Sequence, residues 1–170
     1  MLWCPRAGSL GFEVPLSWIR ANQQVLRKDD MSTTENNKAV IRKFLEEVIN
    51  QNRMDRADDL VREDFVELDP LPGQRQGRDG LKEVLGIMRS AFPDMHWVVE
   101  EMVAEEDKVV TRFTWTGTHR GTFLGVPATG KSVVVKGVVI DQLQGGKMSY
   151  SRILMDSLGM MRQLGVVPSA

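Results

Sequence analysis

Three polar side chains near the C-terminal end of the chain have types and spacing suited to acid–base chemistry. Tyr150, Arg152 and Asp156 occur at even steps in a stretch where apolar and polar residues alternate. In a β-strand such residues point to one face. A phenol donates a hydrogen bond, a guanidinium stabilises an enolate or a carboxylate, and a carboxylate moves a proton. The pattern predicts a pocket wall built by these residues; the alternative is an ordinary salt bridge between Arg152 and Asp156.

Two further titratable residues are candidates for proton transfer. Asp141 follows the apolar run Val138-Val139-Ile140, where burial would raise its pKa; an exposed acid near a strand end is the alternative. His119 is a candidate general base near the pocket mouth, because an unperturbed histidine titrates at about pH 6.5; a hydrogen bond to its own loop is the alternative. Three acids on a short preceding strand alternate irregularly and are predicted to form a solvated rim: Asp64, Glu67 and Asp69.

Large apolar side chains are predicted to line the same pocket. Phe113 and Trp115 are in phase with each other on the segment 109–119, so they share one strand face. Phe123 follows in the next loop, and Met88 lies on the apolar face of a helical segment. A thioether suits a flat apolar ligand, although core packing is the alternative for methionines.

No cofactor and no metal are expected. Cys4 and two histidines cannot build a Cys/His zinc site. Gly125, Gly130, Lys131 and Ser132 have the spacing of a phosphate-binding loop. That loop needs a parallel strand before it and a helix after it, whereas the residues from Ser132 onward read as an antiparallel strand.

The elements that must hold these residues come in the order helices first and strands second. Amphipathic spacing predicts a helix at 35–50, a shorter one at 56–61 and a third at 77–91, with a brief strand at 64–68 before the third. The period then changes to two. Four strands are predicted at 96–105, 109–119, 132–143 and 147–155, followed by a short apolar segment at 158–164. This is an α+β pattern, with the helices on one face of a curved antiparallel sheet.

Length and composition predict one soluble domain. The chain has 170 residues, of which 42% are hydrophobic and 26% charged. Its formal net charge of -1 gives no basic field for nucleic acid, and no apolar run is long enough to span a membrane. A cytoplasmic location is the default. Residues 1–30 lack periodicity and are predicted to be an extension outside the domain of residues 31–170.

The segment from Gly117 to Lys131, GTHRGTFLGVPATGK, closely resembles the loop signature of SnoaL-like polyketide cyclases, also called ester cyclases. Phe92-Pro93-Asp94 and Gly145-Gly146-Lys147 support the resemblance, which covers about residues 36–168. It implies the NTF2-like cone, a curved sheet wrapped by three helices, with a small apolar molecule in its pocket and a homodimer through the sheet. It also implies ring closure by intramolecular aldol condensation without a cofactor. Relatives commonly read Glu-His-Trp-Asp where this chain has Tyr150-Ser151-Arg152-Ile153, so only Asp156 keeps a carboxylate in that region.

Three hypotheses about function follow. The first is a cofactor-free cyclase, isomerase or lyase acting on an apolar carbonyl or ester compound, with Asp156 or Asp141 as base and with Arg152 and Tyr150 stabilising an oxyanion. The second is a binding or accessory protein that holds a ligand in the same pocket without chemistry. The third is hydrolysis of an epoxide, for which Arg152, Asp156 and Asp141 would form a water-activating group.

Overall fold

The first described element is a long amphipathic helix. The computed structural model describes residues 33–168, and the predicted extension of residues 1–30 lies outside them. A helix at 33–43 continues as the π-helical segment η1 (Phe44–Asn50). The backbone N–H of Gln51 donates to the carbonyl oxygen of Glu46, five residues back, at 2.9 Å. The buried residues of the whole helix follow the predicted three- and four-residue spacing: Asn37, Ile41, Phe44, Leu45, Val48 and Ile49.

Short elements connect this helix to the sheet and to a second long helix. The short elements are η2 (Met54–Arg56), α2 (Ala57–Leu60) and the strand β1 (Val61–Glu67), and the long helix is α3 (Gly77–Ala91). The α3 bounds are those predicted, and its apolar face is buried through Leu81, Leu85 and Met88. The first strand begins three residues earlier than predicted, because the chain extends directly from the end of α2 at Val61.

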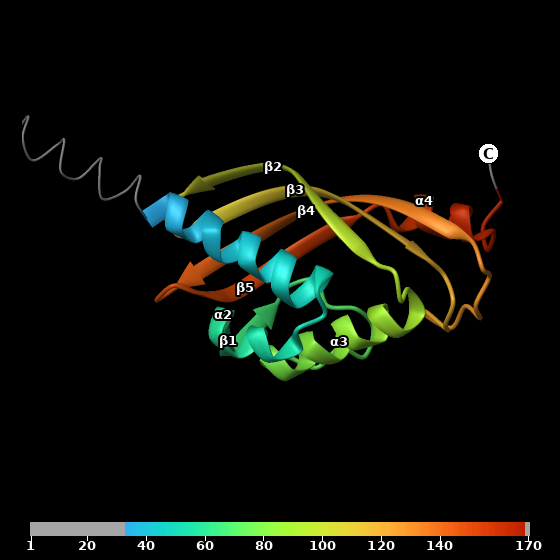
Figure 1. Cartoon of the computed structure of the whole chain (residues 1–170), viewed down its shortest axis with the longest axis horizontal. Helices are drawn as coiled ribbons and strands as arrows, with labels where there is room; N and C mark the ends of the chain where they lie inside the picture. Colours follow the sequence, from blue (N-terminus) through green and yellow to red (C-terminus); the bar gives the residue numbers. More distant parts are fainter. Residues whose placement is uncertain (1–32, 169–170) are drawn as a thin grey trace, which may run out of the picture. The chain divides into compact units, whose positions relative to one another are not determined.

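Five strands form one sheet. The four remaining strands are β2 (His96–Glu105), β3 (Lys108–Thr118), β4 (Ser132–Gln144) and β5 (Lys147–Met155). The order across the sheet is β1-β5-β4-β3-β2, with antiparallel neighbours except for β1, which pairs with β5 in parallel. The predicted helices-then-strands arrangement is confirmed, and Figure 1 shows the first helix and α3 on the same side of the curved sheet.

One face of the sheet packs on these helices. Burial alternates along β3 and β4, so that Phe113 and Trp115 face the helices together with Val135, Val139 and Asp141. The opposite face carries exposed apolar side chains from three strands: Val98, Val134, Val138 and Leu154. A homodimer through this face stays a prediction.

The last helix covers the part of β4 that β5 does not reach. α4 (Ser157–Leu164) packs against β4 through the buried Met160 and Leu164. The side chain of Gln163 accepts a hydrogen bond from Val134 N–H at 2.7 Å and donates one to the Val134 carbonyl at 2.9 Å. Residues 132–136 of β4 extend beyond the end of β5, so this amide pairs a stretch of strand edge that β5 does not reach.

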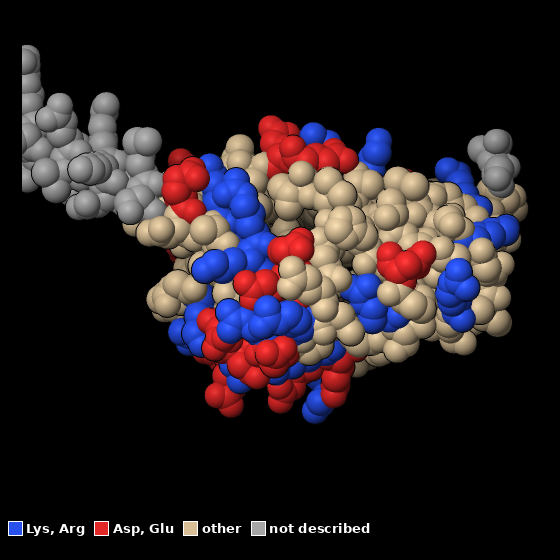
Figure 2. Space-filling model, viewed as in Figure 1, with Lys and Arg blue, Asp and Glu red and all other residues tan. Residues whose placement is uncertain are grey.

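Charged side chains of both signs intermingle around η1, α2 and α3 (Figure 2). Arg56 pairs with Glu47 and Asp59, and Asp58 pairs with Arg78 at 2.8 Å and with Lys82 at 2.6 Å. The Arg56–Glu47 pair links η2 to η1, and the pairs of Asp58 link α2 to α3. Of residues 33–168, no helix is long and apolar enough to cross a membrane.

Gly137 makes room for an aromatic ring on the inner face of the sheet. A Cβ atom at this position would lie 2.5 Å from Cζ of Phe113 and 2.8 Å from the carbonyl oxygen of Leu154. We expect Gly137→Ala to lower the free energy of unfolding by about 1–3 kcal/mol, because neither the buried ring nor the backbone can move away freely.

Gly86 provides the matched control for this substitution. It lies in α3 with nothing within 4 Å of the added Cβ, so Gly86→Ala should stabilise the protein by about 0.5–1 kcal/mol. Urea unfolding of both variants checks the pair. Equal stability of Gly137→Ala and the parent would contradict the packing described for Phe113.

Candidate functional site

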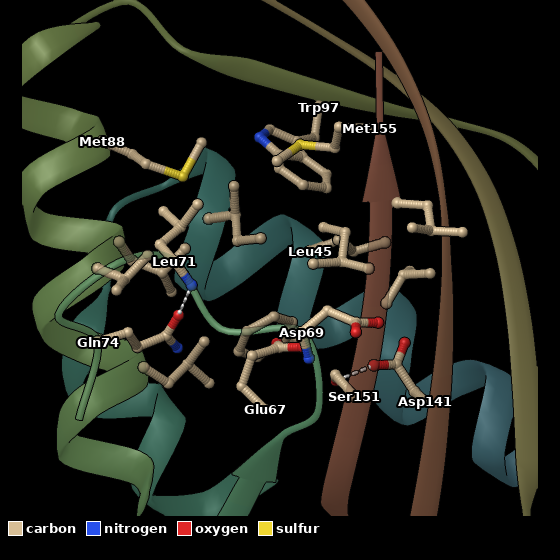
Figure 3. A pocket seen from close by; sticks show the side chains of 18 of the residues that line it. Leu45, Glu67, Asp69, Leu71, Gln74, Met88, Trp97, Asp141, Ser151 and Met155 are labelled. Atoms are coloured by element: carbon tan, nitrogen blue, oxygen red, sulfur yellow. Dashed lines mark hydrogen bonds between the residues drawn. The ribbon is translucent and has the colours of Figure 1, made fainter. Parts of the chain in front are cut away.

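An apolar cavity lies between the inner face of the sheet and the helices. Its volume is about 270 Å³. Most of its wall is apolar, and its inward-facing apolar side chains include Phe44, Leu45, Ile49, Leu71, Leu81, Val84, Leu85, Met88, Trp97, Val139, Met148, Ile153 and Met155. The polar residues of the wall are Glu67, Asp69, Gln74, Asp141, Ser151 and Ser157. Leu71 comes from the loop between β1 and α3, where its N–H donates to the side-chain oxygen of Gln74 at 3.0 Å (Figure 3).

Two buried carboxyl groups and a serine form a row across three adjacent strands. Glu67 of β1 is in register with Ser151 of β5, which is in register with Asp141 of β4. The hydroxyl of Ser151 donates a hydrogen bond to Oδ1 of Asp141 (Figure 3). Asp141 is 2% exposed and Glu67 is 8% exposed. This row is called the carboxyl row below.

Burial makes both carboxyl groups of the carboxyl row weaker acids. Burial raises the pKa of Asp141 to about 7; the hydrogen bond from Ser151 opposes the shift and the nearby charge of Glu67 adds to it. Burial also raises the pKa of Glu67 to about 6, against a hydrogen bond that the Asp69 N–H donates at 3.3 Å. Within residues 33–168 neither carboxyl has a cationic ion-pair partner, and the cavity wall holds no Lys, Arg or His. Each group can therefore carry a proton near neutral pH.

The sequence predicted one member of the carboxyl row and missed the other. The burial expected for Asp141 is confirmed. Glu67 was assigned to a solvated rim, and that assignment is wrong, because the side chain is buried against the cavity. The signal was Phe65, a buried residue two positions earlier on β1, whose strand face Glu67 shares.

The inner face of β5 is the one that carries Ser151, Ile153 and Met155. Tyr150 and Arg152 alternate with these residues and lie on the opposite face. Tyr150 is in register with Gln142 and Val66 on its neighbouring strands. The exposed Arg152 forms an ion pair with Asp69, Nε to Oδ2 at 3.3 Å, and not with Asp156.

Asp156 occupies the N-cap position of α4. Its Oδ1 accepts a hydrogen bond from the Gly159 N–H at 2.8 Å, as capping aspartates do. The side chain is exposed and is not part of the cavity wall, although its neighbours Met155 and Ser157 are. The three residues proposed for epoxide opening are thus held apart: Arg152 at Asp69, Asp156 at the helix cap and Asp141 in the cavity.

Three of the predicted residues gather around Phe92 instead of at the cavity. The Phe92 ring stacks on His119 at 5.1 Å between centroids and meets Trp115 and Phe123 edge-on at 5.1 and 5.5 Å. His119 is fully buried, and its Nδ1 accepts a hydrogen bond from the Thr129 N–H at 3.3 Å. This matches the alternative of a histidine that bonds its own loop.

The other two apolar predictions lie at or behind the cavity wall. Met88 lines it, as predicted. Phe113 is fully buried and lies behind the wall residue Trp97, with the two rings stacked at 4.2 Å.

Two features weighed in the sequence, a metal-ligand cluster and a phosphate-loop-like spacing, can be compared with the described part of the chain. Among residues 33–168, no group of three or more His, Cys, Asp or Glu side chains is arranged to hold a metal ion. Ser132, which ends the phosphate-loop-like spacing, begins strand β4 and is followed by no helix. This agrees with the sequence argument against a nucleotide site there.

Comparison with known proteins finds one matching sequence family and several similar solved structures. The sequence model described as SnoaL-like polyketide cyclase matches residues 39–164. TsrD from Streptomyces laurentii has a TM-score of 0.72 at 26% identity, over 78% of this chain and 97% of that one. A candidate SnoaL-like polyketide cyclase from Jannaschia sp. CCS1 has a TM-score of 0.71 at 24% identity, over 79% and 95%.

A third similar structure carries a different description. AclR, a candidate hydroxylase from Streptomyces galilaeus, has a TM-score of 0.69 at 24% identity, over 81% of this chain and 85% of that one. A search of curated proteins gave no match. The likeness to AclR therefore shows a common fold and leaves the chemistry to be argued from the cavity.

Proposed function

Because the chain belongs to the SnoaL-like polyketide cyclase family and has the NTF2-like α+β fold, we propose that it catalyses proton transfer at a carbon next to a carbonyl group of an apolar substrate. Such a transfer is the first step of an aldol-type ring closure and of an isomerisation. One observation carries this proposal: two carboxyl groups that have no cationic partner among residues 33–168, Glu67 and Asp141, are buried on either side of Ser151 at one part of an apolar cavity.

The two carboxyl groups suit opposite roles. With pKa values of about 6 and about 7, Glu67 ionises before Asp141 as the pH rises. In the form with Glu67 ionised and Asp141 protonated, Glu67 is the base and takes the proton from the carbon. The electron pair of the broken C–H bond moves to the carbonyl oxygen, and Asp141 stabilises the resulting enolate by donating its proton in a hydrogen bond.

The surroundings support this division of roles. The hydroxyl of Ser151 donates a hydrogen bond to Oδ1 of Asp141. In the protonated form of Asp141, Oδ2 is therefore the oxygen that carries the acidic proton. The apolar wall excludes water, and a hydrogen bond to a developing charge is stronger in such a medium than in water. After the new bond forms, the protonated Glu67 can return its proton to the product.

The pH dependence of hydrogen exchange tests this function. Nabumetone, a neutral methoxynaphthyl ketone, serves as the probe, and NMR follows the uptake of deuterium next to its carbonyl in D₂O. We expect the protein to accelerate this exchange with a bell-shaped pH profile whose limbs lie near the two pKa values, at about 6 and about 7. Binding of the probe without any acceleration would contradict the proposal and favour the binding-protein hypothesis.

A further inference from the structure

Trp97 presents an unused hydrogen-bond donor to the cavity. The residue is 6% exposed and forms part of the wall. Its indole Nε1 is buried and has no hydrogen-bond partner within residues 33–168. Leaving a buried donor unpaired is costly, and such groups are rare in folded proteins. A donor of this kind in a cavity wall is explained when a ligand supplies the acceptor.

The position of this donor is fixed from two sides. The backbone N–H of Trp97 donates to Oδ1 of Asn50 at 2.8 Å, and Nδ2 of Asn50 donates to the Trp97 carbonyl at 3.0 Å. The indole ring stacks on Phe113 with an interplanar angle of 24°. The side chain therefore holds its N–H in place before any ligand arrives.

The donor and the carboxyl row lie at different ends of the cavity. Figure 3 shows Trp97 beside Met155 and facing Met88, while Asp141, Ser151 and Glu67 lie together at the other end, beyond Leu45. The sheet register agrees with this view. Trp97 pairs through Trp115 with Val135 of β4, six residues along that strand from Asp141.

The charges of the wall restrict the ligand further. Among residues 33–168, the ionisable residues of the wall are Glu67, Asp69 and Asp141, and no basic side chain lines it. A ligand carboxylate would lose its hydration and meet only like charges, so it is disfavoured.

From these observations we infer that the substrate is an elongated apolar molecule without negative charge, whose second oxygen, remote from the reacting carbonyl, accepts a hydrogen bond from Nε1 of Trp97. The placement of the reacting carbonyl at the carboxyl row rests on the proposed function. The remote contact and the charge selection rest on Trp97 and on the wall itself.

The test compares nabumetone with its analogue that has hydrogen in place of the methoxy group. Calorimetry should show that the parent protein binds nabumetone about fivefold more tightly, the gain of one neutral hydrogen bond. Trp97→Phe keeps a stacked ring but removes the donor, so it should bind both ketones equally. Trp115→Phe is the matched control, because Trp115 also has an unpaired buried Nε1 but lies outside the wall, and it should keep the fivefold ratio.

Two further measurements complete the test. The Trp97 indole N–H resonance of the parent protein should shift with nabumetone more than with the analogue, which gives an answer even if Trp97→Phe folds poorly. Methoxynaphthylacetic acid should bind at least about tenfold more weakly than nabumetone above pH 7. An equal ratio in the parent and in Trp97→Phe, tight binding of the acid, or no binding of either ketone would overturn the inference. If the affinity ratios are as expected but the protein does not accelerate deuterium uptake by nabumetone, the proposed function alone would be refuted.

Discussion

Replacing Glu67 with glutamine is expected to slow protein-catalysed hydrogen exchange of nabumetone by about a hundredfold or more. Glutamine keeps the shape of the side chain and an oxygen that can accept the hydrogen bond from the Asp69 N–H. It cannot take a proton from carbon near neutral pH. The change therefore removes the proposed base and leaves the cavity in place, and NMR of deuterium uptake measures the loss.

Two other variants make this result specific. Glu63→Gln alters an exposed acid on the same strand and should leave the exchange rate within about twofold of the parent. Asp156→Asn tests the base suggested by the sequence, and at the helix cap asparagine is as good as aspartate. A large loss in Asp156→Asn together with normal exchange in Glu67→Gln would reverse the assignment made from the cavity.

Replacing Asp141 with asparagine is expected to stabilise the protein at pH 8 by on the order of 4 kcal/mol relative to the parent. Burial raises the pKa of Asp141 from its usual value of 3.8 to about 7. Between these two values the folded state holds a proton that the unfolded state has released, so the stability of the parent falls as the pH rises through this window. Asparagine never ionises, and its oxygen still accepts the Ser151 hydrogen bond.

The difference between the two proteins is the quantity to measure. Urea unfolding from pH 3 to pH 8 should show a small difference at pH 3, where Asp141 is largely protonated in both the folded and the unfolded state, and the full difference above about pH 7. Acids that do not interact with Asp141 contribute equally to both proteins and cancel, whereas Glu67 interacts with Asp141 and its contribution is part of the measured difference. Parallel stability curves for the parent and Asp141→Asn would mean that folding does not raise the pKa of Asp141.

Hydrophobic periodicity was enough to predict most of the fold. The bounds of α3, β2 and β5 agree with the sequence, because Gly77 begins α3, Pro93 lies shortly before β2 and Gly145-Gly146 directly precedes β5. The burial of Asp141 could be predicted from the apolar run Val138-Val139-Ile140 that precedes it.

The site was harder to predict where a strand carries polar residues on both of its faces. Around Tyr150, Ser151 and Arg152 polar residues occur on both faces of β5, so composition does not tell which face is inward. Pairing with β4 decides it, by bringing Ser151 opposite the inward-facing Asp141. Residue type alone also does not separate a cavity wall from a filled core, which is why Trp115 and Phe123 were expected at the pocket but pack on Phe92.

The parallel pairing of β1 with β5 has a consequence for the order of folding. Strands β2 to β5 follow one another as antiparallel neighbours, so their contacts form between segments close in sequence. Glu67 meets Ser151 only when a loop of more than eighty residues closes, and long loops close late and at a greater entropic cost. Strands β2 to β5, and Asp141 with them, can thus be in place before β1 pairs with β5. Catalytic competence would then appear after most of the native secondary structure, as a separate and slower kinetic phase.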